Sequence, residues 1–137
     1  MSSATVHAAS LRAPALVALG GTAAFALLRM RDPHGEGSYG FCPFLLMTGR
    51  PCPGCGGLRA VNDLTHGDVM GALSSNVLVV ALVVVLAVAW ILWVVRLLKG
   101  RPGPMIRLGP RAGLAVIGLI VVFGVVRNLP FGAWLAP

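Results

Sequence analysis

Three apolar segments dominate the pattern of hydrophobic and polar positions along the chain. The first occupies residues 13–28 between two arginines, the second residues 77–98, and the third starts at Ala112 and continues to about Leu129. A helix needs about 20 apolar residues to cross a hydrocarbon layer roughly 30 Å thick. Flanking arginines can extend the short first segment by snorkelling. The pattern predicts an all-α membrane protein with three transmembrane helices, at about 13–28, 77–98 and 112–129.

The long connection, residues 30–75, carries a second and weaker pattern. Leu58, Val61 and Leu64 recur at helical spacing and predict a short amphipathic helix, which Gly67 ends. Asp68 is placed to cap a second short helix, and Asn76 to cap the second apolar segment. Both short helices are too brief to cross a bilayer, so we expect them at the membrane interface.

Composition narrows the class of protein further. Hydrophobic residues make up 57% of the chain and charged residues 11%, whereas soluble domains carry about 25% charged residues. A chain of this size could not bury so much apolar surface in a soluble fold. We therefore expect the lipid bilayer, and no nucleic acid, as the partner, and a single integral membrane domain over residues 1–137.

The net charge of +7 bears on orientation. The short connection between the second and third segments is dense in basic residues, which favour the cytoplasmic side of a membrane. These residues are Arg96, Lys99, Arg101, Arg107 and Arg111. The distribution predicts a multi-pass protein with its N-terminus inside and residues 30–75 outside.

The first segment has one alternative interpretation, a cleaved signal peptide, because Ala24-Phe25-Ala26 resembles a cleavage site. The preceding region holds only Arg12 and His7 as basic residues, so we expect the segment to remain as an anchor. It also carries small residues at spacing four, Ala18, Thr22 and Ala26. Small residues let helices approach closely in lipid. We expect packing against the second segment, with docking of a membrane protein partner as the alternative.

All three cysteines, Cys42, Cys52 and Cys55, lie in the long connection. Pro53 and Gly54 predict a tight turn that brings the sulfurs of Cys52 and Cys55 to one side. We expect Cys42 to lie close to this pair, joined to it by a disulfide or a shared metal ion.

The order of residues in this connection resembles domain-of-unknown-function family 2752, small bacterial multi-pass membrane proteins with a CPxCG loop motif. The shared elements are Cys42-Pro43, Thr48-Gly49, Cys52-Pro53-Gly54-Cys55-Gly56, Arg59-Ala60, Leu64, Gly67-Asp68 and Asn76. Leu58 and Val77 depart from the commoner pattern, and Leu58 removes the hydroxyl that often precedes the arginine. The resemblance implies a protein of the bacterial inner (cytoplasmic) membrane and no established reaction.

Three interpretations of the cysteines stay open. Cysteines outside the cytoplasm tend to form disulfides. Two cysteines at this spacing also suit Zn²⁺. With Cys42 the ion would have three ligands, and it needs a fourth. His66 would lie about 13 Å along a helix from the pair, and His34 lies in a glycine-rich stretch. A Cys52–Cys55 pair before a helix could also be redox-active.

Function is predicted mainly from what the sequence lacks. No apolar segment has an ionisable residue at its centre, and there is no catalytic triad or phosphate-binding loop, so no catalytic or cofactor-binding residue is proposed. We expect a non-enzymatic accessory or assembly subunit with a structural cysteine loop. The alternatives are a thiol–disulfide oxidoreductase using Cys52 and Cys55, and a structural zinc protein.

The residues assigned to loop structure are Pro53, Gly54, Gly56, Arg59, Asp63, Gly67, Asp68 and Asn76. We also expect an ion pair between Arg59 and Asp63, which are four residues apart.

Overall fold

The computed structural model describes residues 3–31, 33–35, 42–101 and 109–135, and within these ranges it contains helices and no strand. The helices are α1 (Ser3–Met30), α2 (Pro43–Thr48), α3 (Gly57–His66), α4 (Val69–Leu98) and α5 (Pro110–Val126), followed by a 3₁₀ helix, η1 (Pro130–Leu135). The all-helical class is therefore confirmed.

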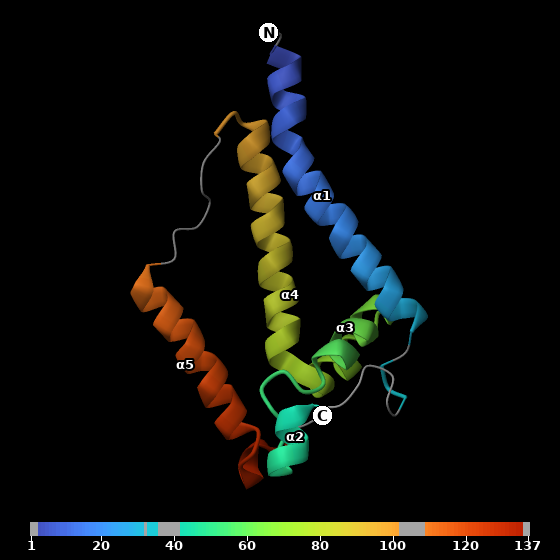
Figure 1. Cartoon of the computed structure of the whole chain (residues 1–137), viewed down its shortest axis with the longest axis vertical. Coiled ribbons are helices and arrows are strands. Elements are labelled where there is room, and N and C mark those ends of the chain that lie inside the picture. Colours follow the sequence, from blue (N-terminus) through green and yellow to red (C-terminus); the bar gives the residue numbers. More distant parts are fainter. Residues whose placement is uncertain (1–2, 32, 36–41, 102–108, 136–137) are drawn as a thin grey trace.

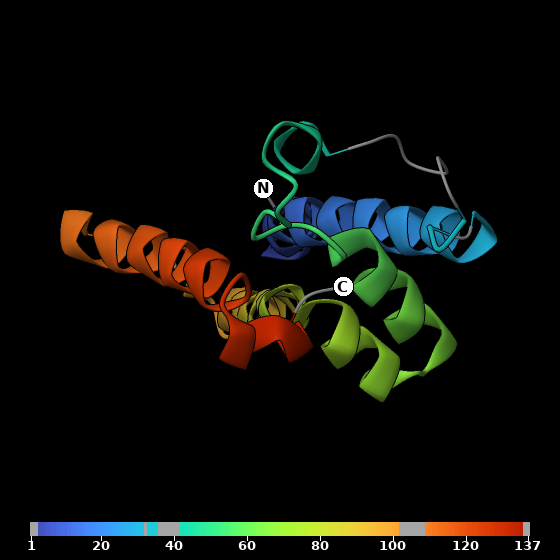
Figure 2. The same cartoon turned by 90° about the horizontal axis from the view of Figure 1, so that it is seen from below.

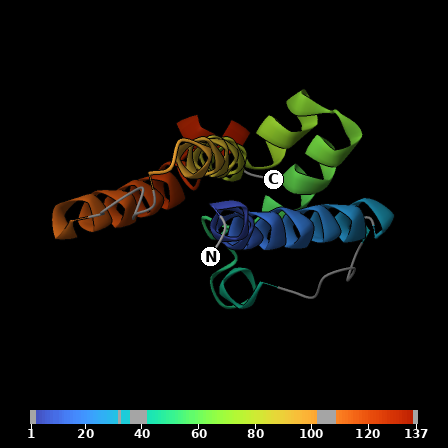
Figure 3. The same ribbon diagram turned by 90° about the horizontal axis from the view of Figure 1, so that it is seen from above.

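Helices α1 and α4 run along the long axis of an elongated molecule, and α5 begins partway along this axis and continues toward the end where α2 lies (Figure 1). The start of α1 and the C-terminal end of α4 lie at one end, and α2, α3 and η1 lie toward the other. Viewed along the long axis, α1 and α5 extend away from α4 in opposite directions (Figures 2 and 3). Helix α1 contacts both α3 and α4, and the Trp90 indole donates a hydrogen bond to the Pro14 carbonyl at 3.0 Å.

Large apolar side chains point outward along all three long helices. Leu19 on α1, Leu82 on α4 and Leu114 on α5 are each more than half exposed, whereas the buried apolar side chains of the described residues are few. Residues Leu11–Met30 and Val69–Leu98 are long and apolar enough to cross a membrane. Such surface is typical of lipid contact, and it indicates a membrane protein.

The third predicted crossing is shorter in the structure. Helix α5 has 17 residues, which corresponds to about 26 Å, and η1 continues beyond Arg127 with further apolar residues. A third crossing therefore stays a prediction, while the other two apolar segments coincide with helices of spanning length.

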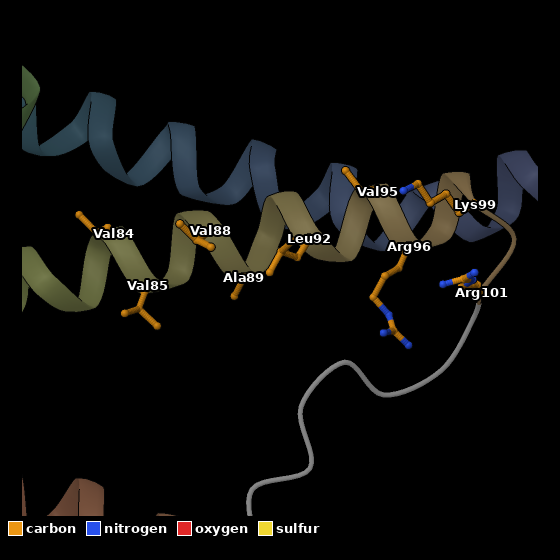
Figure 4. Close-up of a pocket in the computed structure, with 9 residues that line it drawn as sticks. All are labelled: Val84, Val85, Val88, Ala89, Leu92, Val95, Arg96, Lys99 and Arg101. Carbon is orange, nitrogen blue, oxygen red and sulfur yellow. The ribbon is translucent and has the colours of Figure 1, made fainter.

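One face of α4 borders a groove of about 630 Å³. Valine and leucine side chains line it, and Arg96, Lys99 and Arg101 stand at its end. Figure 4 shows the apolar side chains and Arg96 along α4, with Lys99 and Arg101 just beyond its C-terminal end. The rest of the basic connection, residues 102–108 including Arg107, lies outside the described residues.

The turn between α3 and α4 follows the predicted signals. Gly67 adopts a left-handed conformation at φ 79°, and its N–H bonds to the Leu64 carbonyl while that of Asp68 bonds to the Asp63 carbonyl. This pair of bonds is the Schellman arrangement that ends a helix. The Asp68 carboxylate then accepts from the Gly71 N–H at 2.8 Å and starts α4.

Helix α4 contains a break at Asn76, whose backbone is extended at φ −167° and ψ 99°. The Val79 N–H donates to the Asn76 side-chain oxygen at 3.1 Å, which is a helix cap. The segment before the break corresponds to the predicted short helix and the segment after it to the predicted span. The expected cap at Asn76 is thus present.

Helix α2 is not among the helices that the sequence pattern predicts. Its signals are nonetheless local, because Pro43 occupies the first turn and Gly49 ends the helix in a left-handed conformation at φ 66°. Proline at the start and glycine just past the end are characteristic of helices.

Candidate functional site

The three cysteine sulfurs form one cluster where α2, α3 and the intervening loop meet. The Cys42 sulfur lies 3.6 Å from that of Cys52, which lies 3.1 Å from that of Cys55. All three atoms lie within 4.8 Å of one another. The structure therefore places Cys42 beside the Cys52–Cys55 pair, as the sequence led us to expect, and no disulfide joins these three cysteines.

Residues 51–55, called here the cysteine knuckle, fold into a tight turn ahead of α3. The Cys55 N–H bonds to the Cys52 carbonyl at 3.1 Å, with Pro53 and Gly54 at the turn's centre. Gly56 then takes a left-handed conformation at φ 79° and precedes the first residue of α3. The Cys52 N–H points back at the Cys55 sulfur, 3.2 Å away, so a backbone donor stabilises negative charge on that sulfur.

Asn76 fastens the knuckle to α4. Its side chain is completely buried, and its amide nitrogen donates to the carbonyls of Pro53 and Cys55, each at 2.9 Å. The extended backbone at this residue interrupts α4, and the same side chain caps the helix that resumes after the break. Asn76 was expected only to cap, so its bonds to the knuckle are an addition from the structure.

Arg127, at the end of α5, holds the knuckle from the other side. The side chain is 1% exposed, and its Nη1 atom donates to the carbonyls of Cys52, Pro53 and Cys55 at 2.9, 3.3 and 3.1 Å. Its Nε and Nη2 atoms are buried and have no hydrogen-bond partner in the described part of the chain. The guanidinium also lies over the Phe123 ring, 5.2 Å from its centroid.

Asn128 and Gly124 complete this contact. The Asn128 amide donates to the Pro51 carbonyl at 2.9 Å and to the Gly124 carbonyl at 2.8 Å. A Cβ atom on Gly124 would lie 2.7 Å from the Pro53 ring, a distance that side chains do not tolerate. Glycine at position 124 therefore allows α5 to approach the knuckle.

Sequence reasoning missed the roles of Arg127, Asn128 and Gly124. A signal was present: Arg127 is charged and Asn128 polar, and together they end an otherwise apolar segment. Such residues in or beside a membrane segment mark a specific contact. The partner of that contact could not be read, because the knuckle lies about 75 residues earlier in the chain.

The expected ion pair between Arg59 and Asp63 does not form. The Asp63 carboxylate accepts from the Ser75 hydroxyl at 2.9 Å and lies 3.2 Å from His34 Nε2, while Arg59 is exposed. Asp63 is almost buried, so it bonds to the groups that cover it rather than to a side chain on the solvent face of its helix. The prediction was wrong because helical spacing says nothing of tertiary neighbours.

Neither candidate histidine completes the cysteine cluster. His34 pairs with Asp63, and the His66 ring contacts the Asn62 carbonyl of its own helix at 3.0 Å. Among the described residues, the group able to hold a metal ion consists of Cys42, Cys52 and Cys55.

The thiols of the cluster differ in acidity. Hydrogen bonding from the Leu45 backbone and from Cys55 lowers the pKa of Cys42 below its ordinary value. Burial, with hydrogen bonding to Cys52 and Cys42, raises the pKa of Cys55 to about 12. Without a bound cation, Cys42 therefore gives up its proton more readily than Cys55.

The C-terminal end of α1 is held by α3. The Asn62 amide donates to the Leu28 carbonyl at 2.6 Å, and Arg29 donates to the Thr65 carbonyl. Thr22 and Ala26 of the small-residue face are exposed, and Cβ atoms added at Gly20 and Gly21 would meet open space. Helix α1 thus contacts α4 near Pro14 and leaves much of that face uncovered.

One known protein family matches part of the chain. The model of the family described as "Protein of unknown function (DUF2752)" matches residues 42–90, which include the cysteine knuckle, α3 and most of α4. This match confirms the family resemblance seen in the sequence. Neither the curated proteins nor the solved structures contain a match to the chain.

Proposed function

Because the family model that matches residues 42–90 describes proteins of unknown function, we propose a role for this chain from the geometry of its site. The chain is a non-enzymatic integral membrane protein, an accessory or assembly subunit, in which the cysteine knuckle is a structural unit that joins α4 to α5. We place it in a bacterial inner membrane with three crossings, its N-terminus inside.

The single observation that carries this proposal is the set of hydrogen bonds received by the knuckle. Four of its carbonyls, those of Pro51, Cys52, Pro53 and Cys55, accept from Asn76, Arg127 and Asn128. A buried carbonyl without a partner costs about 1–3 kcal/mol, so a fold that supplies donors to four of them fixes the loop in one conformation. Fixing a loop between two membrane helices is a structural task.

An assembly role is supported by the uncovered helix faces. Thr22 and Ala26 on the small-residue face of α1 are exposed, and close approach through small residues is how helices associate in lipid. We propose that a membrane protein partner docks through the first span.

The test combines stability with recovery of a partner from native membranes. Asn128→Ala removes the bond to Pro51, and we expect it to lower the free energy of unfolding in detergent by about 1–3 kcal/mol. Ser74→Ala is the control, because Ser74 is exposed and its hydroxyl donates to the Gly71 carbonyl of its own helix. Cross-linking followed by mild-detergent purification of the wild-type protein should recover a partner in stoichiometric amount.

Two results would contradict the proposal. Recovery of the wild-type chain as a lone monomer at its native expression level excludes an assembly subunit. A mixed disulfide trapped with another protein by Cys55→Ser would replace the structural role with thiol–disulfide exchange through Cys52.

A further inference from the structure

The spacing of the three sulfurs is compatible with one shared metal ion. A disulfide requires sulfurs about 2.05 Å apart, whereas the Cys42–Cys52 and Cys52–Cys55 distances are 3.6 and 3.1 Å. Thiolates around a tetrahedral zinc ion, with Zn–S bonds of about 2.3 Å, lie about 3.8 Å apart. Three sulfurs within 4.8 Å of one another can all bind one ion, while a disulfide would leave one cysteine out.

The charge around the cluster gives an independent observation. Arg127 is buried, its Nε and Nη2 atoms have no hydrogen-bond partner in the described ranges, and it is close enough to Cys52 and Cys55 to interact with them electrostatically. A buried unpaired cation is strongly unfavourable. An anion at the cysteine cluster would compensate it.

We infer that Cys42, Cys52 and Cys55 bind a zinc ion as three thiolates, and that Arg127 balances the charge of the complex. Three thiolates and Zn²⁺ together carry one negative charge, which matches the single positive charge of Arg127. Binding releases three protons to solvent as the thiols ionise. Copper(I) with the same ligands would carry two negative charges and leave one uncompensated.

The described residues supply three ligands, and the fourth position of a tetrahedral ion would be taken by water or another ligand. His34 and His66 are engaged elsewhere, and no other described His, Cys, Asp or Glu joins the cluster. Three protein ligands with one exchangeable position are typical of zinc sites that bind a further group. The bonds from Asn76 and Arg127 to the knuckle carbonyls hold the ligand residues in place, as contacts behind metal ligands do.

The experiment uses the full chain purified in detergent without chelator. We expect about one zinc per chain by elemental analysis, and cobalt(II) replacing zinc should show thiolate charge-transfer bands and the strong visible bands of a tetrahedral ion. Cys42→Ser and Cys55→Ser should each abolish stoichiometric binding. Arg127→Gln should weaken zinc affinity by about 10- to 100-fold. Arg127→Lys keeps the positive charge and should reduce the affinity less. Arg59→Gln, at an exposed position, is the control and should leave the affinity unchanged.

A second measurement does not depend on any variant folding. Zinc added to reduced, metal-free wild-type protein should release protons, and intact-mass analysis should find three thiols after chelation. A Cys52–Cys55 or Cys42–Cys52 disulfide in the purified protein, binding of copper(I) but not zinc, or failure of the wild type to bind either ion would overturn the inference. The zinc inference depends on the knuckle of the proposed function but not on a partner subunit. A protein that binds no metal but still assembles with a partner would contradict the zinc site and leave the proposed structural role unaffected.

Discussion

At the scale of single residues, Asn76 links the local sequence to the tertiary site. Its side-chain oxygen accepts from Val79, and its nitrogen donates to Pro53 and Cys55. The oxygen's role follows from position in sequence, because asparagine before an apolar helix is a common cap. The nitrogen's role depends on tertiary structure. Helix α3 packs against α4, and this packing brings the knuckle next to the break in α4 at Asn76.

We predict that the two roles of Asn76 separate in a pair of variants. Asn76→Ser retains a capping hydroxyl but cannot reach the knuckle, so it should lose about 1–3 kcal/mol of unfolding free energy. Asn76→Ala also loses the cap and should cost about 1 kcal/mol more. Chemical unfolding in detergent, followed by circular dichroism, measures both values. A serine variant as stable as the wild type would show that the knuckle bonds contribute nothing.

At the scale of elements, the turn from α3 to α4 is the best-specified part of the molecule. Gly67 and Asp68 are adjacent in sequence, and each performs its role through bonds within a few residues. The two short helices follow from this turn, and they carry Asn62, Asp63 and Asn76 to their contacts. The accuracy of the sequence prediction here reflects the local origin of helix ends.

Substitutions in this turn should have moderate and separable effects. Gly67→Ala meets no steric obstacle but must adopt φ 79°, which should cost about 1 kcal/mol. Asp68→Ala removes the cap on α4 at a similar cost, about 1 kcal/mol, whereas Asp68→Asn keeps an accepting oxygen and should be nearly neutral. Thermal unfolding of the three variants in one detergent gives the comparison. Equal losses for Asp68→Asn and Asp68→Ala would rule out the capping bond as the cause.

At the scale of the whole molecule, the arrangement of the long helices has a consequence for the two ends of the chain. The start of α1 and the end of α4 lie together, and α5 returns to the opposite end, where η1 contacts α4. Three crossings with this arrangement put the termini on opposite sides of the membrane, while two crossings would put them on the same side.

Reporter fusions should therefore give opposite results at the two termini. We expect a fluorescent protein that folds in the cytoplasm to be active at the N-terminus, and a phosphatase that requires the outer side to be active at the C-terminus. The reason is the dense basic connection between α4 and α5, which favours the cytoplasmic side. An N-terminal phosphatase fusion that is active would reverse the orientation, and cytoplasmic activity at both termini would remove the third crossing.

The sequence by itself determined the helical class, two helices of membrane-spanning length, the ends of α3, the cap at Asp68 and the turn of the knuckle. The helices of spanning length depend on the apolar length of one continuous segment, and the other features depend on glycine conformation or side-chain caps, which act within about one or two helical turns. Tertiary structure alone decided that Arg127, Asn128 and Gly124 meet the knuckle, and that Asp63 pairs with His34 and Ser75 instead of Arg59. These contacts join residues far apart in the chain, and only the packing of the helices brings their donors and acceptors within reach.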